Sequence, residues 1–211
     1  MNVVEEPARG AASATTNAVS IAACAAPEAL AALEPHPDLD AFRPPQAQLE
    51  ALVDIAAERD GCVVVAVADD GRSLVGYAAF HRPSAIETWG EDGSGALIEL
   101  GAIEVASSHR GMKLAERLLG AGFAGGRYDA TVVFATLYRW HYDLKRTGLG
   151  ELGYRRMLER LYGSAGLVPL ETTDPEIASH GANRLMARVG ALSAPAVVEE
   201  FERLRKPPGR W

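Results

Sequence analysis

Apolar positions along this chain follow two spacings: the alternation and short runs typical of strands, and the three-to-four-residue spacing typical of helices. Two β-branched runs flank "DDGR" within residues 62–83, which predicts an antiparallel hairpin. The stretches "ALIELGAIEVA" at 96–106 and "ATVVFATLY" at 130–138 predict two more strands, and "NRLMARVG" at 183–190 predicts a last one. The chain therefore supplies strands for one sheet.

Helical spacing is present in four stretches: residues 46–61, 111–123, 151–166 and 194–206. The second of these gathers apolar or small residues on one face: Ala115, Leu118, Leu119, Gly122 and Phe123. A strand is expected at 18–25 and a short helix at 27–33, whereas 36–46 and 83–95 are expected to be loops. This order predicts an α+β fold, in which helices cover a mixed sheet.

Length, composition and charge describe a single acidic domain. With 211 residues, 48% of them hydrophobic, the chain can bury a full core. Residues 1–17 are small and polar, and we expect them to form a flexible N-terminal arm on a domain spanning 18–211. The net charge of −7 argues against binding to nucleic acid or to an anionic membrane, because both need an excess of basic residues. Any phosphate site must therefore be local.

The N-terminal apolar stretch and the two cysteines predict neither targeting nor metal binding. "AVSIAACAAPEALAAL" follows Glu5 and Glu6 instead of a basic segment and is interrupted by Pro27, so we expect no signal peptide. Because no run of about 18 apolar residues could span a membrane, we expect a cytoplasmic protein. Cys24 and Cys62 form no CxxC pair and lack a histidine cluster, so we expect two buried apolar side chains, with neither a disulfide framework nor a metal site.

The turn between the strand at 96–106 and the helix that follows it is the strongest functional signal. Arg110 and Lys113 lie where the helix starts, although the positive end of the helix dipole disfavours cations there. A bound phosphate would attract both cations and accept hydrogen bonds from first-turn N–H groups, which lack partners within the helix. The residues expected to bind it are consecutive: Arg110, Gly111, Met112, Lys113, Leu114 and Ala115.

This turn resembles the pyrophosphate-binding motif of the GNAT N-acetyltransferase superfamily, which is Arg or Gln, two residues, Gly, any residue, then Gly or Ala. Arg110, Lys113 and Ala115 occupy the motif's positions, and Lys113 departs from its glycine. We expect Lys113 to be helical, and a helical residue needs no positive φ. The turn matches neither a Walker loop nor a dinucleotide GxGxxG turn.

Four regions of the chain resemble the acetoin-utilisation acetyltransferase family, the AcuA-type proteins. They run from about His36 to Gly190: "HPDLDAFRPP" with "ALVDIA", "IELGAIEVA", "YRWHYDLK" and "DPEIASHGANRLMARVG". The resemblance implies a single-domain GNAT fold that uses acetyl-CoA as donor and needs no metal. It also implies a protein lysine as acceptor, specifically a lysine of acetyl-CoA synthetase, whose acetylation switches that enzyme off.

Acetyl transfer to an amine requires a group that removes the proton from the charged lysine. Glu99 lies where many GNAT enzymes carry their general base, and Glu104 is the reserve candidate. Because five residues separate them, a regular strand would place them on opposite faces unless a bulge intervenes. The backbone around Ile103 and Val105 is expected to donate an N–H to the acetyl carbonyl. By resemblance, Tyr162 is expected to protonate the departing thiolate.

The sequence leaves three points open. The aromatic run at residues 138–145 could present His141 as a proton relay or, as its tyrosines and tryptophan favour, a surface for the acceptor protein. His180 and Asn183 lie in a family-like stretch without a derivable role. Besides the acetyltransferase, two interpretations remain: a binding regulator of acetyl-CoA synthetase for which acetylation is secondary, and a GNAT enzyme that acts on a small-molecule amine.

Overall fold

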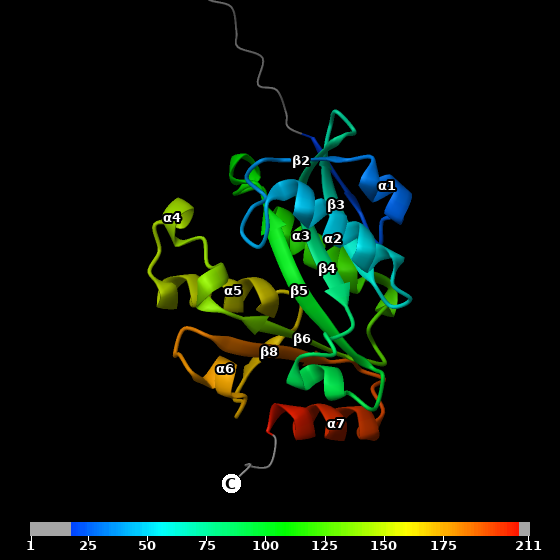
Figure 1. Cartoon of the computed structure of the whole chain (residues 1–211), viewed down its shortest axis with the longest axis vertical. Helices are drawn as coiled ribbons and strands as arrows, with labels where there is room; N and C mark the ends of the chain where they lie inside the picture. The colour runs from blue at the N-terminus through cyan, green and yellow to red at the C-terminus, as the bar shows by residue number, and fades with distance from the viewer. Residues whose placement is uncertain (1–17, 207–211) are drawn as a thin grey trace, which may run out of the picture.

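The computed structural model describes residues 18–206, which fold into one mixed sheet flanked by helices (Figure 1). The sheet has eight strands: β1 (Val19–Ala22), β2 (Glu34–Pro35), β3 (Cys62–Ala68), β4 (Ser73–His81), β5 (Leu97–Val105), β6 (Val132–Leu137), β7 (Val168–Leu170) and β8 (Arg184–Val189). Their order is β1-β3-β4-β5-β6-β8-β7, and β2 pairs with β4 off that path. The pairs β5–β6 and β2–β4 are parallel and the others antiparallel.

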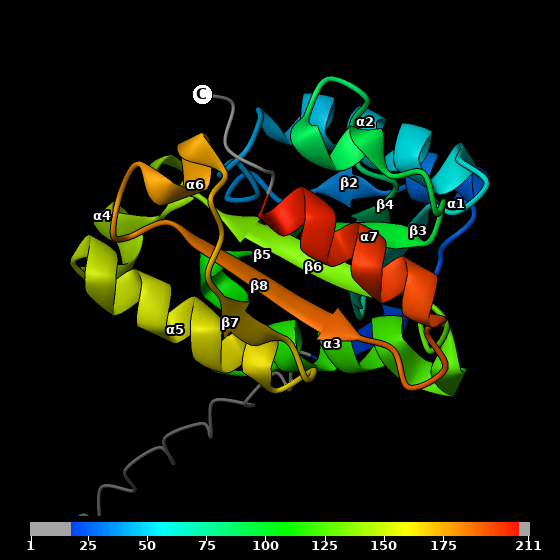
Figure 2. The same cartoon turned by 90° about the horizontal axis from the view of Figure 1, so that it is seen from below.

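Helices cover both faces of this sheet. The described α-helices are α1 (Pro27–Ala31), α2 (Pro45–Ala57), α3 (Leu114–Phe123), α4 (Leu144–Thr147), α5 (Glu151–Gly163), α6 (Pro175–Ala178) and α7 (Pro195–Arg205). Figure 2 shows α1, α2 and α7 on one face and α3 and α5 on the other. The predicted α+β fold, with helices over a mixed sheet, is therefore confirmed. The N-terminal arm expected at residues 1–17 lies outside the described residues.

The core forms on both faces because the strands carry apolar side chains on both. On the α3 face, Phe80 of β4 packs against Phe123 and Tyr128, with ring centroids 5.6 and 5.2 Å away. On the α7 face, Trp89 stacks between Phe134 of β6 and Phe201 of α7, at 4.5 and 5.7 Å. The central strands are therefore packed on both sides, which holds the backbone that leads to the site.

The sheet opens between its two parallel neighbours, β5 and β6. They are paired only from Leu97 to Glu99 on β5, after which the strands diverge (Figure 1). A bulge in β5 accompanies the opening, because Phe80 pairs with Leu100 while Ala79 pairs with Ala102, which leaves Gly101 as the extra residue. A Cβ atom at Gly101 would lie 2.2 Å from Nε2 of His81, so a larger residue here would require the His81 ring to move.

Most predicted elements are confirmed: the hairpin β3–β4, the strands β5, β6 and β8, and the helices α2, α3, α5 and α7. The elements expected at 18–25 and 27–33 correspond to the short β1 and α1. Four elements, β2, β7, α4 and α6, lack a predicted counterpart because each spans two to four residues, too few for a periodicity to appear. None of the helices within residues 18–206 is long and apolar enough to cross a bilayer.

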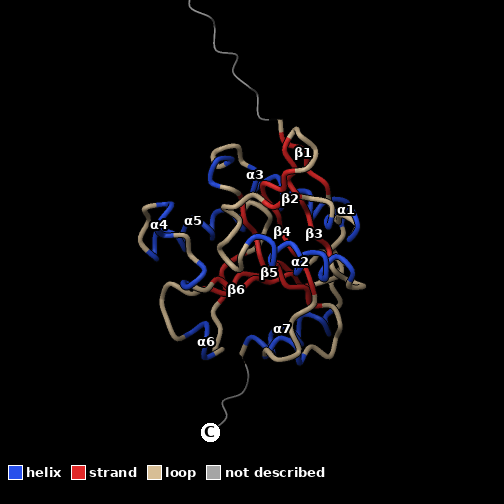
Figure 3. The backbone as a smooth tube through the Cα atoms, turned by 45° about the horizontal axis from the view of Figure 1, so that its top comes forward, coloured by secondary structure: helices blue, strands red, loops and turns tan. Residues whose placement is uncertain are grey.

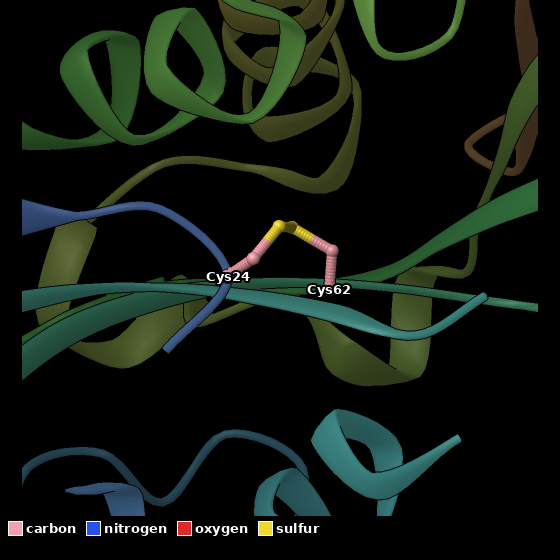
Figure 4. Close-up of a disulfide and its surroundings, with 2 residues drawn as sticks. All are labelled: Cys24 and Cys62. Carbon is pink, nitrogen blue, oxygen red and sulfur yellow. A yellow bond between two sulfur atoms is a disulfide. The ribbon is translucent and has the colours of Figure 1, made fainter. Parts of the chain in front are cut away.

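The expectation of two unpaired, apolar cysteines is wrong: Cys24 and Cys62 form a disulfide, with their Cα atoms 4.5 Å apart (Figure 4). The reason lies in the topology. Strand β1 runs antiparallel to β3 with Ala22 opposite Val65, so the chain leaving β1 passes the start of β3. Sequence spacing gives no sign of this, because the cysteines are 38 residues apart.

Candidate active site

A cavity of about 590 Å³ fills the opening between β5 and β6. Its walls come from the diverging strands, from the start of α3, and from the apolar face of α5 with Met157, Leu158 and Leu161. The loop before α2 closes one side with Ala41 and Phe42. The fold thus brings together residues separated by more than 100 positions around one elongated space.

The cationic end of the cavity lies at the turn between β5 and α3. Helix α3 begins at Leu114, later than the predicted start at Gly111, and Lys113 is its N-cap residue. Gly111 and Lys113 both have positive φ, 83° and 54°. Lys113 is therefore not helical, contrary to the expectation. Its left-handed backbone explains why the motif has glycine at this position, because a residue with a Cβ atom there costs about 1 kcal/mol of folding free energy. Lys113 makes no side-chain capping bond, and the first-turn residues of α3, whose N–H groups have no acceptor within the helix, line this end of the cavity.

Arg110 lies in the same turn and is held by a carboxylate from elsewhere in the chain. Its Nη2 donates to Oδ2 of Asp143 at 2.6 Å. Asp143 belongs to the segment between β6 and α5, and both side chains line the cavity. His109 and Arg160 add two more basic side chains to this lining. Asp143 thus lies among cations, at the end of the cavity suited to an anion.

Glu104 lines the cavity on β5 and is fixed by two hydrogen bonds. Its Oε2 accepts from the hydroxyl of Tyr77 at 2.8 Å, and its Oε1 accepts from the backbone N–H of Ala41 at 2.9 Å. Burial raises the pKa of Glu104 above its usual value, and these hydrogen bonds partly oppose that rise. Burial beside this carboxylate also raises the pKa of Tyr77, so its hydroxyl keeps its proton and donates.

Glu99 is 7% exposed and, unlike Glu104, is not part of the cavity lining. Its Oε1 accepts from the hydroxyl of Thr136 at 3.4 Å, and Thr136 lines the cavity. Burial raises the pKa of Glu99 to about 7, and nearby His81 limits the rise. The carboxyl group is therefore one side chain away from the cavity.

The bulge at Gly101 puts the two glutamates on the same face of the sheet. Glu104 pairs with Tyr77 and Glu99 with His81, and these two β4 residues, four apart, point the same way. In a regular strand, alternation would have placed Glu99 and Glu104 on opposite faces. The structure instead contains a bulge between them, which the sequence analysis had left open as the exception.

Three tyrosines line the cavity near α5. Tyr162 is 5% exposed, and burial raises its pKa above the usual value. Tyr142 and Tyr154 stack on each other with centroids 4.7 Å apart, and Tyr142 donates to the carbonyl of Ala182 at 2.7 Å. Sequence reasoning selected Tyr162 and missed Tyr154, Thr136 and Asp143. For these missed residues the sequence offered one hint, the aromatic content of the segment 138–145, which contains Tyr142 and Asp143.

The aromatic segment 138–145 forms one side of the cavity mouth. Tyr138 and Trp140 stack at 4.4 Å, and Trp140 is 53% exposed. His141 lies 4.9 Å from Phe42, and burial lowers its pKa, which favours the neutral ring. Trp140 is thus the exposed aromatic side chain of this segment.

His180 and Asn183 make local contacts that shape the chain near β8. The amide side chain of Asn183 accepts from the N–H of Arg139 at 3.1 Å and donates to the carbonyl of Glu176 at 3.1 Å. Nδ1 of His180 accepts from the N–H of Ala182 at 3.1 Å. Both lie away from the cavity between β5 and β6, along a second hollow, of about 310 Å³, beside β8. Within residues 18–206 no group of three or more His, Cys, Asp or Glu is arranged to hold a metal ion.

The cavity suits a donor made of a thioester on a long chain that ends in a diphosphate. The turn before α3 offers cations and backbone N–H groups, the face of α5 is apolar, and β5 offers the carboxyl group of Glu104. Beyond Glu99 the edge of β5 that faces β6 has lost its strand partner, so its backbone groups open toward the cavity. These are the features of the GNAT class of acetyltransferases, and the sequence model of the Acetyltransferase (GNAT) family matches residues 28–124.

Closer relatives narrow the class. The chain is 43% identical to the acetoin utilization protein AcuA of Bacillus subtilis (strain 168), over 90% of each chain, and 41% identical to that of Bacillus licheniformis, over 85% and 84%. It also superposes on the crystal structure of an acetoin utilization protein from Exiguobacterium sibiricum with a TM-score of 0.87 and 40% identity, over 91% and 90% of the chains. The chain belongs to the AcuA family of GNAT acetyltransferases, and it is an acetyl-CoA-dependent acyltransferase.

Proposed function

We propose that this protein transfers the acetyl group of acetyl-CoA to a lysine of acetyl-CoA synthetase, inactivating that enzyme, in acetoin and acetate metabolism. The observation that carries the proposal is the cavity between β5 and β6, which has cations at the turn before α3 and is lined by Glu104, with the buried Glu99 linked to it through Thr136. The family relationship supports acetoin utilization as its setting. An AcuA-type enzyme is expected to have a protein as acceptor.

The donor's diphosphate would bind at the turn before α3. Backbone N–H groups from Gly111 to Ala115, Met112 and Leu114 included, would donate to it, and Arg110 and Lys113 would add charge. The chain of the donor would lie along the unpaired edge of β5. There the backbone around Ile103 and Val105, both in the cavity lining, would donate an N–H to the acetyl carbonyl oxygen, where negative charge develops.

Proton removal from the lysine is assigned to Glu99. A carboxyl group with a pKa of about 7 accepts a proton readily near neutral pH, and Thr136 connects it to the cavity. Glu104 remains the alternative base, since it lines the cavity directly. Both of its oxygens are already hydrogen-bonded, which favours a positioning role for it.

Protonation of the departing thiolate is assigned to Tyr162. Its raised pKa keeps the hydroxyl protonated, and the side chain lines the cavity beside the apolar face of α5. The acceptor would approach over the aromatic segment 138–145, where Trp140 is exposed. Large aromatic side chains at a cavity mouth are frequent anchors in protein interfaces.

The deciding experiment incubates the purified protein with acetyl-CoA carrying a labelled acetyl group and with acetyl-CoA synthetase. We expect label on one synthetase lysine, a mass increase of one acetyl group, and loss of synthetase activity that requires the donor. Inhibition without added acetyl-CoA would instead identify a binding regulator. Label on small amines but on no protein would identify a small-molecule acetyltransferase. Both outcomes would contradict the proposal.

A further inference from the structure

Four charged side chains of alternating sign connect the two sides of the cavity. Arg110 pairs with Asp143, Arg146 lies 3.9 Å from the same Asp143 oxygen, and Arg146 forms two hydrogen bonds with Asp40 at 2.7 and 2.9 Å. Asp143 also accepts from the N–H of Arg146 and so caps α4. In Figure 3 α4 lies with α5 on the side of the molecule away from α1 and α2.

Asp143 is the unexpected member of this set. It is 11% exposed, and its carboxylate lies 2.6 Å from the guanidinium that the donor's diphosphate requires. While Nη2 of Arg110 donates to Asp143, fewer of the five N–H groups of this guanidinium are available to the diphosphate. A diphosphate entering beside an aspartate is also repelled by it, and strongly so where little water intervenes.

We propose that Asp143 is an internal competitor for the donor: it holds Arg110 in the free protein and gives it up to the diphosphate when acetyl-CoA binds. The proposal rests on the donor site assigned above. Arg146 is already placed to receive Asp143, because the atoms are 3.9 Å apart and the two residues share the cap of α4. The exchange therefore needs side-chain rotation and no change of fold.

The substitution Asp143→Asn distinguishes two roles for Asp143, because competing for Arg110 and positioning Arg110 predict opposite changes in donor affinity. If Asp143 competes, removing its charge favours the donor; if Asp143 merely orients Arg110 for the diphosphate, removing the charge weakens donor binding. Asparagine caps helices as well as aspartate does, so α4 keeps its N-cap. Asp143→Ser is a second neutral capping variant if the first does not fold.

The measurement is the dissociation constant of coenzyme A by calorimetry at low salt. We expect D143N to bind coenzyme A about tenfold more tightly than the wild-type protein. Glu50→Gln, an exposed change on α2 that removes one charge elsewhere, is the matched control and is expected to leave the affinity within about twofold. Equal or weaker binding by D143N would overturn the proposal.

Arg110→Ala supplies the second test. Without the guanidinium there is no pair to break, so adding D143N to R110A should improve affinity less than D143N does alone. An equal gain in both backgrounds would mean that Asp143 does not act through Arg110, against the proposal. A crystal structure with coenzyme A should show Arg110 on the diphosphate and not on Asp143.

The donor site and the role of Asp143 can be refuted separately. Wild-type protein that does not bind coenzyme A would refute the donor site and everything built on it. Wild-type protein that binds coenzyme A, together with a D143N variant that gains nothing, would refute only the role of Asp143.

Discussion

Tyr77 and Glu104 form a buried hydrogen-bonded pair across β4 and β5, in which the phenol donates to the carboxylate at 2.8 Å. The pair ties the sheet to the loop before α2, because the same carboxylate accepts from the N–H of Ala41. Phe42, the next residue, packs against His141 at the cavity mouth. Glu104 thus fixes the wall on which the acceptor would rest, whether or not it ever takes a proton.

Replacing Tyr77 with phenylalanine should destabilise the protein by about 2 kcal/mol, because a buried carboxylate loses a hydrogen-bond donor. Tyr142→Phe is the matched control. It removes a hydroxyl that donates to the uncharged carbonyl of Ala182, and it should cost about 1 kcal/mol. Urea unfolding at pH 7 measures both. Equal losses would show that the charge of Glu104 adds nothing to its bond with Tyr77.

The pH dependence of acetyl transfer should follow the deprotonation of Glu99. With its pKa raised to about 7, the carboxyl is mostly protonated at pH 6, so the rate should rise through pH 7 and then level off. Glu99→Gln should bind coenzyme A normally, lose the rise, and turn over at least roughly 100-fold more slowly. Glu104→Gln is the comparison: if it abolishes the pH dependence while E99Q retains it, the two roles must be exchanged.

Glu99 should also make stability depend on pH. A carboxyl group whose pKa is raised on folding stabilises the native state below its unfolded pKa, and that stability is lost as pH rises through the folded value. Between about pH 4.5 and 7 the wild-type protein should therefore lose stability relative to E99Q, by at most about 3 kcal/mol. Denaturant melts of both proteins at several pH values give the difference. A constant difference across that window would argue against the raised pKa.

Lys113 should respond differently to glycine and to alanine. Its φ of 54° is unfavourable for any residue with a Cβ atom, so Lys113→Gly should stabilise the protein by about 1 kcal/mol relative to Lys113→Ala. Both variants remove the same charge from the cavity and should weaken coenzyme A binding alike. Thermal unfolding and calorimetry separate the two effects. If the alanine variant is the more stable one, the left-handed backbone is not a source of strain.

The disulfide should contribute measurably to stability. Closing a loop between residues 38 apart stabilises a fold by about 4 kcal/mol in the chain-entropy treatment. Reductant should therefore lower the melting temperature of the wild-type protein, whereas a variant with serine at positions 24 and 62 should melt low with or without it. Mass spectrometry under non-reducing conditions checks that the bond is present. A melting temperature indifferent to reductant would be incompatible with this contribution.

The sequence predicts the elements around the site better than the site itself. The strand β5 and the helix α3 have long, clear periodicities, and Arg110, Lys113 and Ala115 lie between them in a recognisable order. The bulge at Gly101 is different, because it depends on pairing with β4, some 20 residues away. No local pattern in β5 distinguishes that glycine from one in a regular strand.

Contacts between residues far apart in the sequence could not be predicted either. Arg110 and Asp143 are 33 residues apart, and Cys24 and Cys62 are 38 apart. Each pair exists because the sheet order brings together turns that are distant along the chain. Charge and spacing could single out Arg110, but they could not identify the carboxylate beside it.

The short run of pairing between β5 and β6 also bears on which acyl groups can be transferred. Beyond Glu99 the opening between the two halves of the sheet is lined by side chains and is not spanned by a ladder of backbone hydrogen bonds. The width of the opening therefore depends on the side chains that line it, so substitutions among them can change which acyl groups fit without removing a backbone hydrogen bond between the two strands.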